Sequence, residues 1–371
     1  MKKHKVLIIP NAEITKVTND FTVEKNIGEF AAELQSLGSE VTIYGQIVNE
    51  PNNIHVYKLN ENDLNVKGLY RRSNKVLNYI LLYLRVIPEV LKSDFIYIFY
   101  PTAFKYTAFI CCILKKKYGL YVRGMDDMQG QIPSLIYKNA AVGFCVADVF
   151  TDNINTIAGK QVAYTIRPMI TLTERDIVIG RQYEKKDSYK ILYLGRMTND
   201  KGIIELLHAV AELKDSKYKF ELSLVGDGEY FDELKKLSDH LNIHDVISFK
   251  GATFDSQRIR QYFLNSDIYI LPSYHEGFPR TLYEAMIYGT PIITTFVGGI
   301  PSLMKEGVNC MKIEPKSIKD IVLSLNFAFK NYDQFSLLAL EATETVSNLL
   351  KTRKYSHAMD VHRYLNNFKK E

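Results

Sequence analysis

Short apolar runs alternate with longer amphipathic stretches along the first half of the chain. Apolar runs predict buried strands, whereas apolar residues spaced three and four positions apart predict helices. Gly38 follows the first helical stretch, at a position where glycine commonly ends a helix. The pattern predicts strands over 5–10, 41–45, 54–59, 95–100 and 120–123, and helices over 21–37, 72–92 and 102–117.

The same alternation starts afresh after a polar stretch over 181–190. This stretch has no hydrophobic periodicity, so we interpret it as a linker between two domains. Beyond it the pattern predicts strands over 191–194, 222–225, 246–249, 268–271, 292–295 and 311–313. The predicted helices cover 202–214, 230–242, 256–265, 280–288 and 317–331, and a final basic helix covers 350–370.

Apolar strands separated by helices of this length are typical of parallel, doubly wound sheets. The 371 residues are also enough for two domains of ordinary size. We therefore expect an α/β fold with two Rossmann-like, doubly wound domains that face each other across a cleft. The N-terminal domain is expected over 1–182 and the C-terminal domain over 183–350, and a C-terminal helix over 351–371 could pack back on the N-terminal domain.

Composition narrows the class of protein without indicating a chemistry. The hydrophobic fraction of 46% and the charged fraction of 24% are typical of a soluble globular protein. No uninterrupted apolar run reaches the roughly 18–20 residues of a membrane span, and the apolar run near the N-terminus is too short for a signal peptide. The four cysteines have no CxxC spacing and no nearby histidine, which predicts a reduced, cytoplasmic protein without structural zinc.

Positive charge is concentrated in one segment of the N-terminal half. Between Lys67 and Arg123 eleven basic residues face two acidic ones, so this segment carries +9 while the net charge of the chain is only +5. The segment fits a surface that meets anionic lipid or a phosphorylated acceptor. It fits equally well a pair of ordinary amphipathic helices with solvated lysine ends. No nucleic-acid recognition motif accompanies it, so we expect no nucleic-acid partner.

The turn that follows the predicted strand over 191–194 carries two cations. Its sequence is GRMTNDKG, from Gly195 to Gly202, and Arg196 and Lys201 lie on either side of the turn. Free backbone amides at such a turn suit a phosphate, which arginine binds bidentately and lysine binds as a point charge. The pair fits a diphosphate leaving group, although surface cations in a polar loop are the default interpretation of this motif alone.

A second motif follows the predicted strand over 268–271 and carries two glutamates. The sequence HEGFPRTLYEAM places Glu276 in a loop and Glu284 in the helix that begins at Pro279. Glu284 can accept two hydrogen bonds from a ribose diol, while Glu276 can lie beside a sugar ring. The amides of Gly277 and Phe278 could bind a developing anion or sugar hydroxyls.

These motifs together resemble the retaining glycosyltransferases of family 4, which have the GT-B fold. The resemblance covers 190–315, and its hallmark is two glutamates separated by seven residues, matched by Glu276 and Glu284. It implies that Arg196 and Lys201 hold the donor diphosphate, that Glu284 binds the ribose and that Glu276 contacts the transferred sugar. The donor-binding set that it implies also includes Gly277, Phe278, Thr281, Gly226, Gly251, Gly298 and Gly299.

The N-terminal half is similar to the family only loosely. Many members have a Gly-Gly turn after the first strand, where this chain has PNAE over 10–13. Members also place a catalytic histidine after the fourth or fifth strand, and Asp126 is the best candidate for that position, with Asp127 second. Both aspartates could instead cap the next helix. The Arg123-Gly124 turn before them is similar to that of polysaccharide-assembly members.

The resemblance implies a retaining hexosyltransferase that needs no metal or other cofactor. It would move a sugar from a UDP- or GDP-sugar to a saccharide or lipid-linked acceptor, such as a polyprenyl-diphosphate-linked glycan in capsule or O-antigen assembly. The enzyme would be cytoplasmic and could contact the inner face of the membrane peripherally. Two alternatives stay open: a sugar-nucleotide epimerase or hydrolase on the same scaffold, and a non-catalytic sugar-nucleotide-binding assembly subunit.

Overall fold

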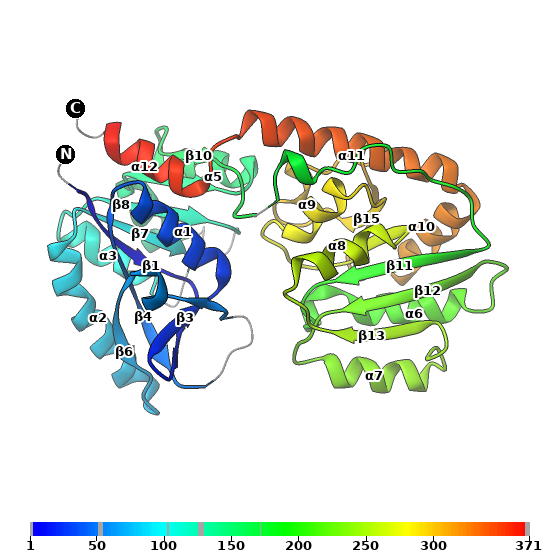
Figure 1. Ribbon diagram of the computed structural model, residues 1–371, viewed down its shortest axis with the longest axis horizontal. Helices are drawn as coiled ribbons and strands as arrows, with labels where there is room; N and C mark the ends of the chain where they lie inside the picture. The colour runs from blue at the N-terminus through cyan, green and yellow to red at the C-terminus, as the bar shows by residue number, and fades with distance from the viewer. Residues whose placement is uncertain (1–2, 51–54, 102–103, 125–129, 171, 368–371) are drawn as a thin grey trace. The chain divides into compact units, whose positions relative to one another are not determined.

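The chain folds into two compact units, and its last helix belongs to the first of them (Figure 1). The computed structural model describes residues 3–50, 55–101, 104–124, 130–170 and 172–367. The first unit contains residues Met1–Ile170 and Lys354–Glu371, and the second contains Thr171–Arg353. The chain therefore passes into the second unit at residue 171, twelve residues before the expected boundary, and returns to the first unit at residue 354.

The first unit is built on a parallel sheet. Its central strands lie in the order β10-β9-β8-β7-β1-β4, and β6 pairs with the far edge of β4. The direction of strand succession reverses between β1 and β7, which is where ligands of such sheets bind. The strands are β1 (Lys5–Ile9), β4 (Glu40–Val48), β6 (Asn65–Tyr70), β7 (Phe95–Tyr100), β8 (Tyr118–Val122), β9 (Val142–Cys145) and β10 (Ala163–Thr165).

A small antiparallel extension continues this sheet beyond β4. It contains β2 (Ile14–Val17), β3 (Asp20–Val23) and β5 (Tyr57–Lys58). The helix predicted over 21–37 is therefore wrong at its start, because 21–23 pair with β2 and α1 begins only at Lys25. Phe21 in β3 and Ile27 in α1 are both apolar, so the spacing of hydrophobic residues alone did not show where the strand ends and the helix begins.

Helices α1 (Lys25–Ser36), α2 (Lys75–Lys92), α3 (Tyr106–Ile113), α4 (Gln131–Asn139) and α5 (Asp148–Ala158) belong to the first unit, together with the last helix, α12 (His357–Asn367). The helix predicted over 102–117 is too long, since α3 ends at Ile113 and a turn leads into β8. The single helix predicted over 350–370 is also wrong, because a break after Thr352 separates α12 from the helix before it.

Helix α12 is held on the first unit by buried contacts. His357 lies among aromatic rings and its Nε2 is hydrogen-bonded to the hydroxyl of Tyr97. Burial lowers the pKa of His357 to about 3, so the ring is neutral and adds no unpaired charge to the core. Farther along the helix, the Tyr364 hydroxyl donates to the Ala141 carbonyl at 2.7 Å.

The second unit contains a sheet of parallel strands in the order β13-β12-β11-β14-β15-β16. Succession reverses between β11 and β14, whose residues Ile191 and Ile268 lie side by side. The carboxyl ends of these two strands therefore form the expected ligand-binding edge. The strands are β11 (Ser188–Leu194), β12 (Lys219–Val225), β13 (Ile247–Gly251), β14 (Ile268–Leu271), β15 (Ile292–Thr295) and β16 (Met311–Ile313).

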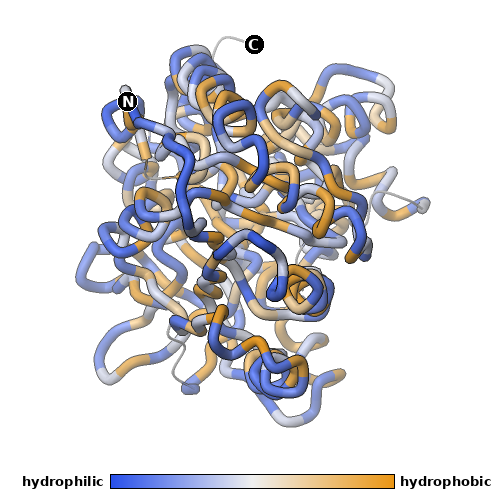
Figure 2. The backbone as a smooth tube through the Cα atoms, turned by 90° about the vertical axis from the view of Figure 1, so that its right-hand side faces the viewer, coloured by the Kyte–Doolittle hydropathy of each residue, from blue (hydrophilic) through white to orange (hydrophobic). Residues whose placement is uncertain are grey.

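The helices of the second unit connect these strands and include one that the pattern did not predict. They are α6 (Ile203–Leu213), α7 (Phe231–His240), α8 (Ser256–Leu264), α9 (Arg280–Ile287), α10 (Ile318–Lys330) and α11 (Tyr332–Thr352). The unpredicted α11 packs along α9 and buries Phe335, Ala339, Ala342, Val346 and Leu350. Figure 2 shows how hydrophobic and hydrophilic stretches alternate along such helical segments.

The stretch over 181–190 is part of the second unit and does not form a free linker. Its Arg181 guanidinium reaches the ends of α8 and α9, where helix carbonyls lack partners. It donates to the carbonyls of Phe263 (3.3 Å), Tyr288 (2.9 Å) and Ser266, and to the Thr290 hydroxyl (3.0 Å). The polar stretch that suggested a linker thus contains Arg181, which supplies hydrogen-bond donors to the ends of two helices.

Within the described part of the chain, no helix is long and apolar enough to cross a membrane. The two α/β units with parallel sheets are those expected from the sequence.

Candidate active site

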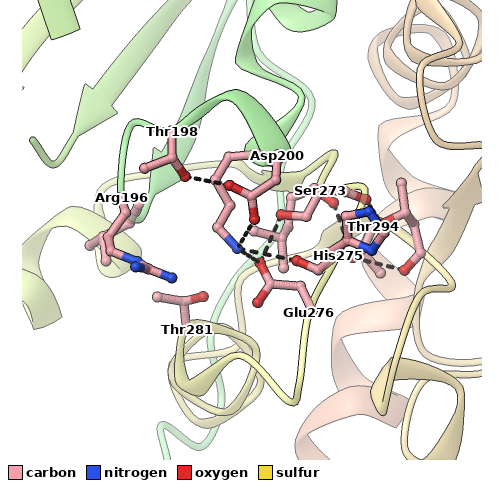
Figure 3. Close-up of polar contacts among 12 residues, drawn as sticks. Arg196, Thr198, Asp200, Ser273, His275, Glu276, Thr281 and Thr294 are labelled. Atoms are coloured by element: carbon pink, nitrogen blue, oxygen red, sulfur yellow. Dashed lines mark hydrogen bonds and ion pairs between the residues drawn. The ribbon is translucent and has the colours of Figure 1, made fainter. Parts of the chain in front are cut away.

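The two predicted motifs meet at the ligand-binding edge of the second sheet. Gly195 to Gly202 follows β11, and the loop from Pro272 to Pro279 follows β14, its neighbour in the sheet. The Tyr274 amide donates to the Asp200 carbonyl at 2.8 Å and joins the two loops. Figure 3 shows the side chains that these loops present.

Lys201 is buried between the two loops and is paired with Glu276. The side chain is 8% exposed, and its Nζ lies 2.8 Å from Glu276 Oε1, whose side chain is 12% exposed. Nζ also lies 3.3 Å from Asp200 Oδ2 and donates to the His275 carbonyl at 3.2 Å. The structure thus brings Lys201 to the carboxylate nearest the expected chemistry, a pairing that the sequence analysis did not foresee.

Glu276 is held from the other side by Ser273, which the sequence analysis did not single out. The Ser273 hydroxyl is fully buried and donates to Glu276 Oε1 at 2.8 Å (Figure 3). The Thr295 hydroxyl in turn donates to the Ser273 carbonyl at 2.7 Å. Glu276 Oε1 therefore accepts hydrogen bonds from both Lys201 and Ser273, and neither of these two bonds involves Oε2.

Asp200 supports the Lys201 side chain from the first loop. The Thr198 hydroxyl donates to Asp200 Oδ1 at 2.5 Å (Figure 3). Burial opposes the charged form of Asp200, but this hydrogen bond and the Lys201 charge outweigh it and lower its pKa. Lys201 therefore lies between two carboxylates, of which Asp200 would keep it partnered if Glu276 turned toward a ligand.

Arg196 has the opposite environment. Its backbone is fixed because the buried Tyr193 hydroxyl donates to the Arg196 carbonyl at 2.7 Å, yet its side chain is exposed. Its guanidinium forms no ion pair or hydrogen bond with any residue that the structure describes. Figure 3 shows it extended toward the side on which Thr281 and Glu276 lie. A guanidinium in this position can bind a phosphate without first breaking another interaction.

Unpaired amides lie beside these side chains. Within the described residues, the amides of Gly277 and Phe278 donate no hydrogen bond, and α9 begins two residues later at Arg280. The Tyr269 hydroxyl donates to Thr281 Oγ1 at 2.6 Å and fixes the first turn of α9. The loop and helix start therefore present the partial positive charge that suits an anion or sugar hydroxyls.

Glu284 lies in the second turn of α9, and three of the other predicted donor-binding residues, Gly277, Phe278 and Thr281, precede it within seven positions. Burial raises the pKa of its carboxyl to about 7, and the Arg280 charge opposes that effect. A carboxyl with this pKa is close to half protonated at neutral pH. Any ligand that donates hydrogen bonds to the carboxylate would shift it to the charged form.

Glycines allow the remaining loops to approach this edge. The Gly226 amide donates to the Gly251 carbonyl at 2.9 Å, which joins the loop that follows β12 to the end of β13. A Cβ on Gly226 would lie 1.8 Å from the Gly195 carbonyl oxygen, so a side chain there would push away the turn that carries Arg196. Gly299 donates its amide to the Gly277 carbonyl at 2.7 Å and holds the Glu276 loop against the turn after β15.

Replacement of Gly298 by alanine is expected to displace the Glu276 loop. Gly298 has φ +57°, and a Cβ at this position would lie 1.7 Å from the Glu276 carbonyl oxygen. We expect the Gly298→Ala variant to lose about 2–4 kcal/mol of unfolding free energy, as measured by urea titration. The matched control is Gly307→Ala, since Gly307 has φ +67° but no atom within 4 Å of the added Cβ. Equal losses in the two variants would contradict the role given to the close approach.

Asp126 and Asp127 lie outside the described residues. Arg123, which precedes them, is described and lies over the Tyr121 ring, 5.9 Å from its centroid. Among the described residues no group of three or more histidine, cysteine, aspartate or glutamate side chains could hold a metal ion.

Residues 175–342 match the family described as glycosyl transferases group 1. The putative teichuronic acid biosynthesis glycosyltransferase TuaC of Bacillus subtilis is 34% identical over 131 residues, which are 35% of this chain and 30% of TuaC. Protein CapJ of Staphylococcus aureus is 25% identical over 303 residues, which are 76% of this chain and 73% of CapJ. For several curated relatives, TuaC included, the chain spans only 30–41% of their length.

Solved structures resemble both units of the chain. The complex of Anabaena HepE with UDP and glucose has a TM-score of 0.71 at 16% identity and covers 98% of this chain and 100% of its own. WaaG, a glycosyltransferase involved in lipopolysaccharide biosynthesis, has a TM-score of 0.65 at 13% identity and covers 96% of this chain and 98% of its own. At these identities the likeness shows the fold, and it confirms the predicted GT-B class with two Rossmann-like domains.

Proposed function

We propose that this chain transfers a sugar from a nucleotide-diphosphate sugar to a saccharide or lipid-linked acceptor. The observation that carries the proposal is the meeting of three features at one sheet edge. These are a buried Lys201–Glu276 pair, the Arg196 guanidinium, and the amides of Gly277 and Phe278, of which the last two have no partner among the residues that the structure describes. The group 1 glycosyl transferase match over 175–342 covers all of these residues and supports the proposal.

In this proposal Arg196, Lys201 and the start of α9 hold the donor diphosphate. The negative charge of the leaving group grows as its bond to the sugar breaks, and a guanidinium and free amides stabilise that charge. The Glu284 carboxylate accepts hydrogen bonds from the ribose hydroxyls, and the glycine turns at 226 and 251 leave room for the nucleotide base. Complexes of HepE with UDP and with UDP-glucose support a nucleotide-sugar donor.

We further propose that transfer retains the anomeric configuration and proceeds on one face of the sugar. Retaining hydrolases place two carboxylates about 5–5.5 Å apart across the bond that breaks. Here Glu276 already shares its Oε1 with Lys201 and Ser273, and Glu284 is assigned to the ribose. Glu276 therefore acts as an electrostatic support for the positive sugar carbon, while the donor phosphate takes the proton of the acceptor hydroxyl. No step requires a metal ion.

The acceptor class is proposed from the relatives. TuaC is a putative teichuronic acid biosynthesis glycosyltransferase. WcaL of Salmonella typhimurium, which is 26% identical over 165 residues, is a putative colanic acid biosynthesis glycosyltransferase. A growing cell-surface polysaccharide, such as a capsule or O-antigen chain on a polyprenyl diphosphate, fits this set. In that setting the enzyme would act in the cytoplasm, and Asp126 is the residue proposed to meet the acceptor.

The experiment that tests the proposal follows donor turnover with and without acceptor. Purified protein is supplied with radiolabelled UDP- or GDP-sugars and with a membrane extract that contains lipid-linked glycans. A transferase produces a labelled acceptor and consumes little donor when the extract is omitted. Donor consumption without any acceptor would favour the epimerase or hydrolase, and donor binding without turnover in either case would favour a non-catalytic subunit.

Donor binding is expected to depend on pH through Glu284. The ribose hydroxyls donate to the carboxylate, so only the deprotonated form binds well, and the raised pKa of about 7 places its titration in the neutral range. The association constant for UDP-glucose should therefore be about tenfold lower at pH 6 than at pH 8. Calorimetric titration at both pH values provides the measurement.

The Glu284→Gln variant is the control for this pH dependence. Glutamine keeps the size and one acceptor oxygen but cannot titrate, so its binding should be weaker than wild type at pH 8 and nearly independent of pH. A wild-type affinity that does not change between pH 6 and pH 8 would contradict the role of Glu284.

A further inference from the structure

Helix α2 is apolar on two opposite faces. Leu82, Val86 and Val90 are buried against the first sheet, as expected for a helix that covers it. On the other side the apolar side chains stay in contact with solvent, each between 44% and 70% exposed. These are Val76, Leu77, Ile80, Leu84 and Leu91.

The exposed apolar residues form one stripe. At about 100° per residue, positions 76, 77, 80, 84 and 91 fall within an arc of about 100° on the helix surface. The neighbouring helix α3 widens the stripe, since the Tyr83 and Tyr106 rings lie 6.1 Å apart and Tyr106 is itself exposed. Ile113, at the end of α3, is exposed as well. We name the five exposed α2 residues, together with Tyr106 and Ile113 of α3, the α2–α3 apolar surface.

Exposed cations adjoin the α2–α3 apolar surface along the chain, since Arg85 follows Leu84 and Lys115 lies two residues beyond Ile113. Arg72, Lys75, Arg85 and Lys115 are exposed, and their side chains form no ion pair or hydrogen bond with the residues described. Glu89, the acid of α2, is only 15% exposed and is already paired with Lys67 at 2.7 Å and Lys92 at 3.6 Å. The helix that carries the surface therefore has exposed positive charge and no exposed acid to balance it.

Other basic residues of the same segment have structural roles. Lys116 donates to the carbonyls of Leu91 and Ser93 at 2.7 and 2.9 Å and so caps the end of α2. Arg71 is paired with Glu13 at 2.9 Å. The cations available to a partner are thus fewer than the composition suggested.

We infer that the α2–α3 apolar surface binds an anionic lipid membrane, with α2 lying in the plane of the interface. The apolar stripe would enter the boundary between headgroups and acyl chains, while the adjoining cations meet anionic headgroups. A second copy of the chain fits less well, because a two-fold contact through α2 would bring unpaired cations against their own copies. This inference concerns residues of the first unit, whereas the donor site belongs to the second, and it does not depend on the proposed sugar transfer.

The test measures cosedimentation of the full chain with vesicles of phosphatidylcholine alone or with phosphatidylglycerol. We expect binding to the anionic vesicles that falls by tenfold or more in the Ile80→Ser, Leu84→Ser double variant. The matched control is Leu337→Ser, Leu340→Ser, because both leucines are similarly exposed on α11 of the second unit. The control should bind like wild type, and thermal unfolding should show that all variants are folded.

A charge variant separates the two contributions to binding. Arg85→Gln with Lys115→Gln should weaken binding to anionic vesicles by about fivefold per cation removed and should make it less sensitive to salt. Failure of the wild type to bind anionic vesicles would overturn the inference, as would equal binding by the Ile80→Ser, Leu84→Ser variant. A wild-type dimer in solution that this double variant dissociates would instead identify a second copy as the occupant.

Discussion

Replacement of Lys201 by methionine is expected to cost both stability and activity. Methionine keeps the length of the side chain but leaves Glu276 buried without its 2.8 Å partner and removes the charge between Glu276 and Asp200. Loss of one partner from a buried ion pair typically destabilises a protein by about 3–5 kcal/mol. Loss of one preorganised charge contact lowers kcat by about 10²–10³-fold. Urea unfolding and initial rates of sugar transfer measure the two effects.

The Lys214→Met variant is the matched control for stability. Lys214 is paired with Asp245 at 2.7 Å, but the carboxylate is 52% exposed, so the loss of this pair should cost much less stability than the loss of Lys201. Lys214 also lies away from the site, at the end of α6. Equal destabilisation by the two variants would show that burial of the Lys201–Glu276 pair does not matter, and near-normal turnover by Lys201→Met would remove Lys201 from the catalytic account.

Replacement of Glu276 by glutamine should lower kcat by at least about 10²-fold while donor affinity changes little. Glutamine still accepts a hydrogen bond from Ser273, so the loop keeps its shape, but the negative charge beside the sugar carbon is gone. Only the interaction made in the transition state is then lost. Steady-state kinetics for kcat and calorimetry for donor binding separate the two quantities. Near-normal transfer by this variant would rule out an essential role for Glu276.

A double variant tests whether Lys201 and Glu276 act as a pair. The double variant Lys201→Met, Glu276→Gln removes both charges, so neither is left buried without its partner. Its loss of unfolding free energy should therefore be smaller than the sum of the losses in the two single variants. The expected difference is on the order of 2 kcal/mol. The Glu314→Gln variant, whose carboxylate is 60% exposed and paired with Lys312, provides the surface control. Strict additivity of the two single effects would contradict a direct coupling.

The sequence was sufficient to predict the α/β class and most strands of the second unit. These strands are continuous apolar runs because both faces of a parallel sheet are covered, and the pattern shows such runs directly. It did not reveal α11, whose buried face contains small residues such as Ala339 and Ala342 that carry little hydrophobic signal. It also assigned Phe21 to a helix, although cross-strand pairing with Lys16 places it in β3.

The residue types of the site could be predicted, but their pairing could not. Lys201 and Glu276 are 75 positions apart, and their contact depends on β14 lying next to β11 in the sheet. Strand order is a property of the whole unit and is not written in either motif. Ser273 lies two residues before the quoted motif, and its role depends on a rotamer that only the packed loop defines. The raised pKa of Glu284 likewise follows from burial in the folded unit.

The central claim is that Arg196 and its neighbours bind a nucleotide-diphosphate sugar. Thermal unfolding in the presence of UDP-, GDP- and ADP-sugars tests it most directly, since a ligand at 100 times its Kd stabilises the folded state by about 2.7 kcal/mol. At least one of these donors should raise the Tm of the wild type, and the same donor should leave the Tm of Arg196→Ala nearly unchanged. Absence of any shift with all three classes, or an equal shift in Arg196→Ala, would contradict the account.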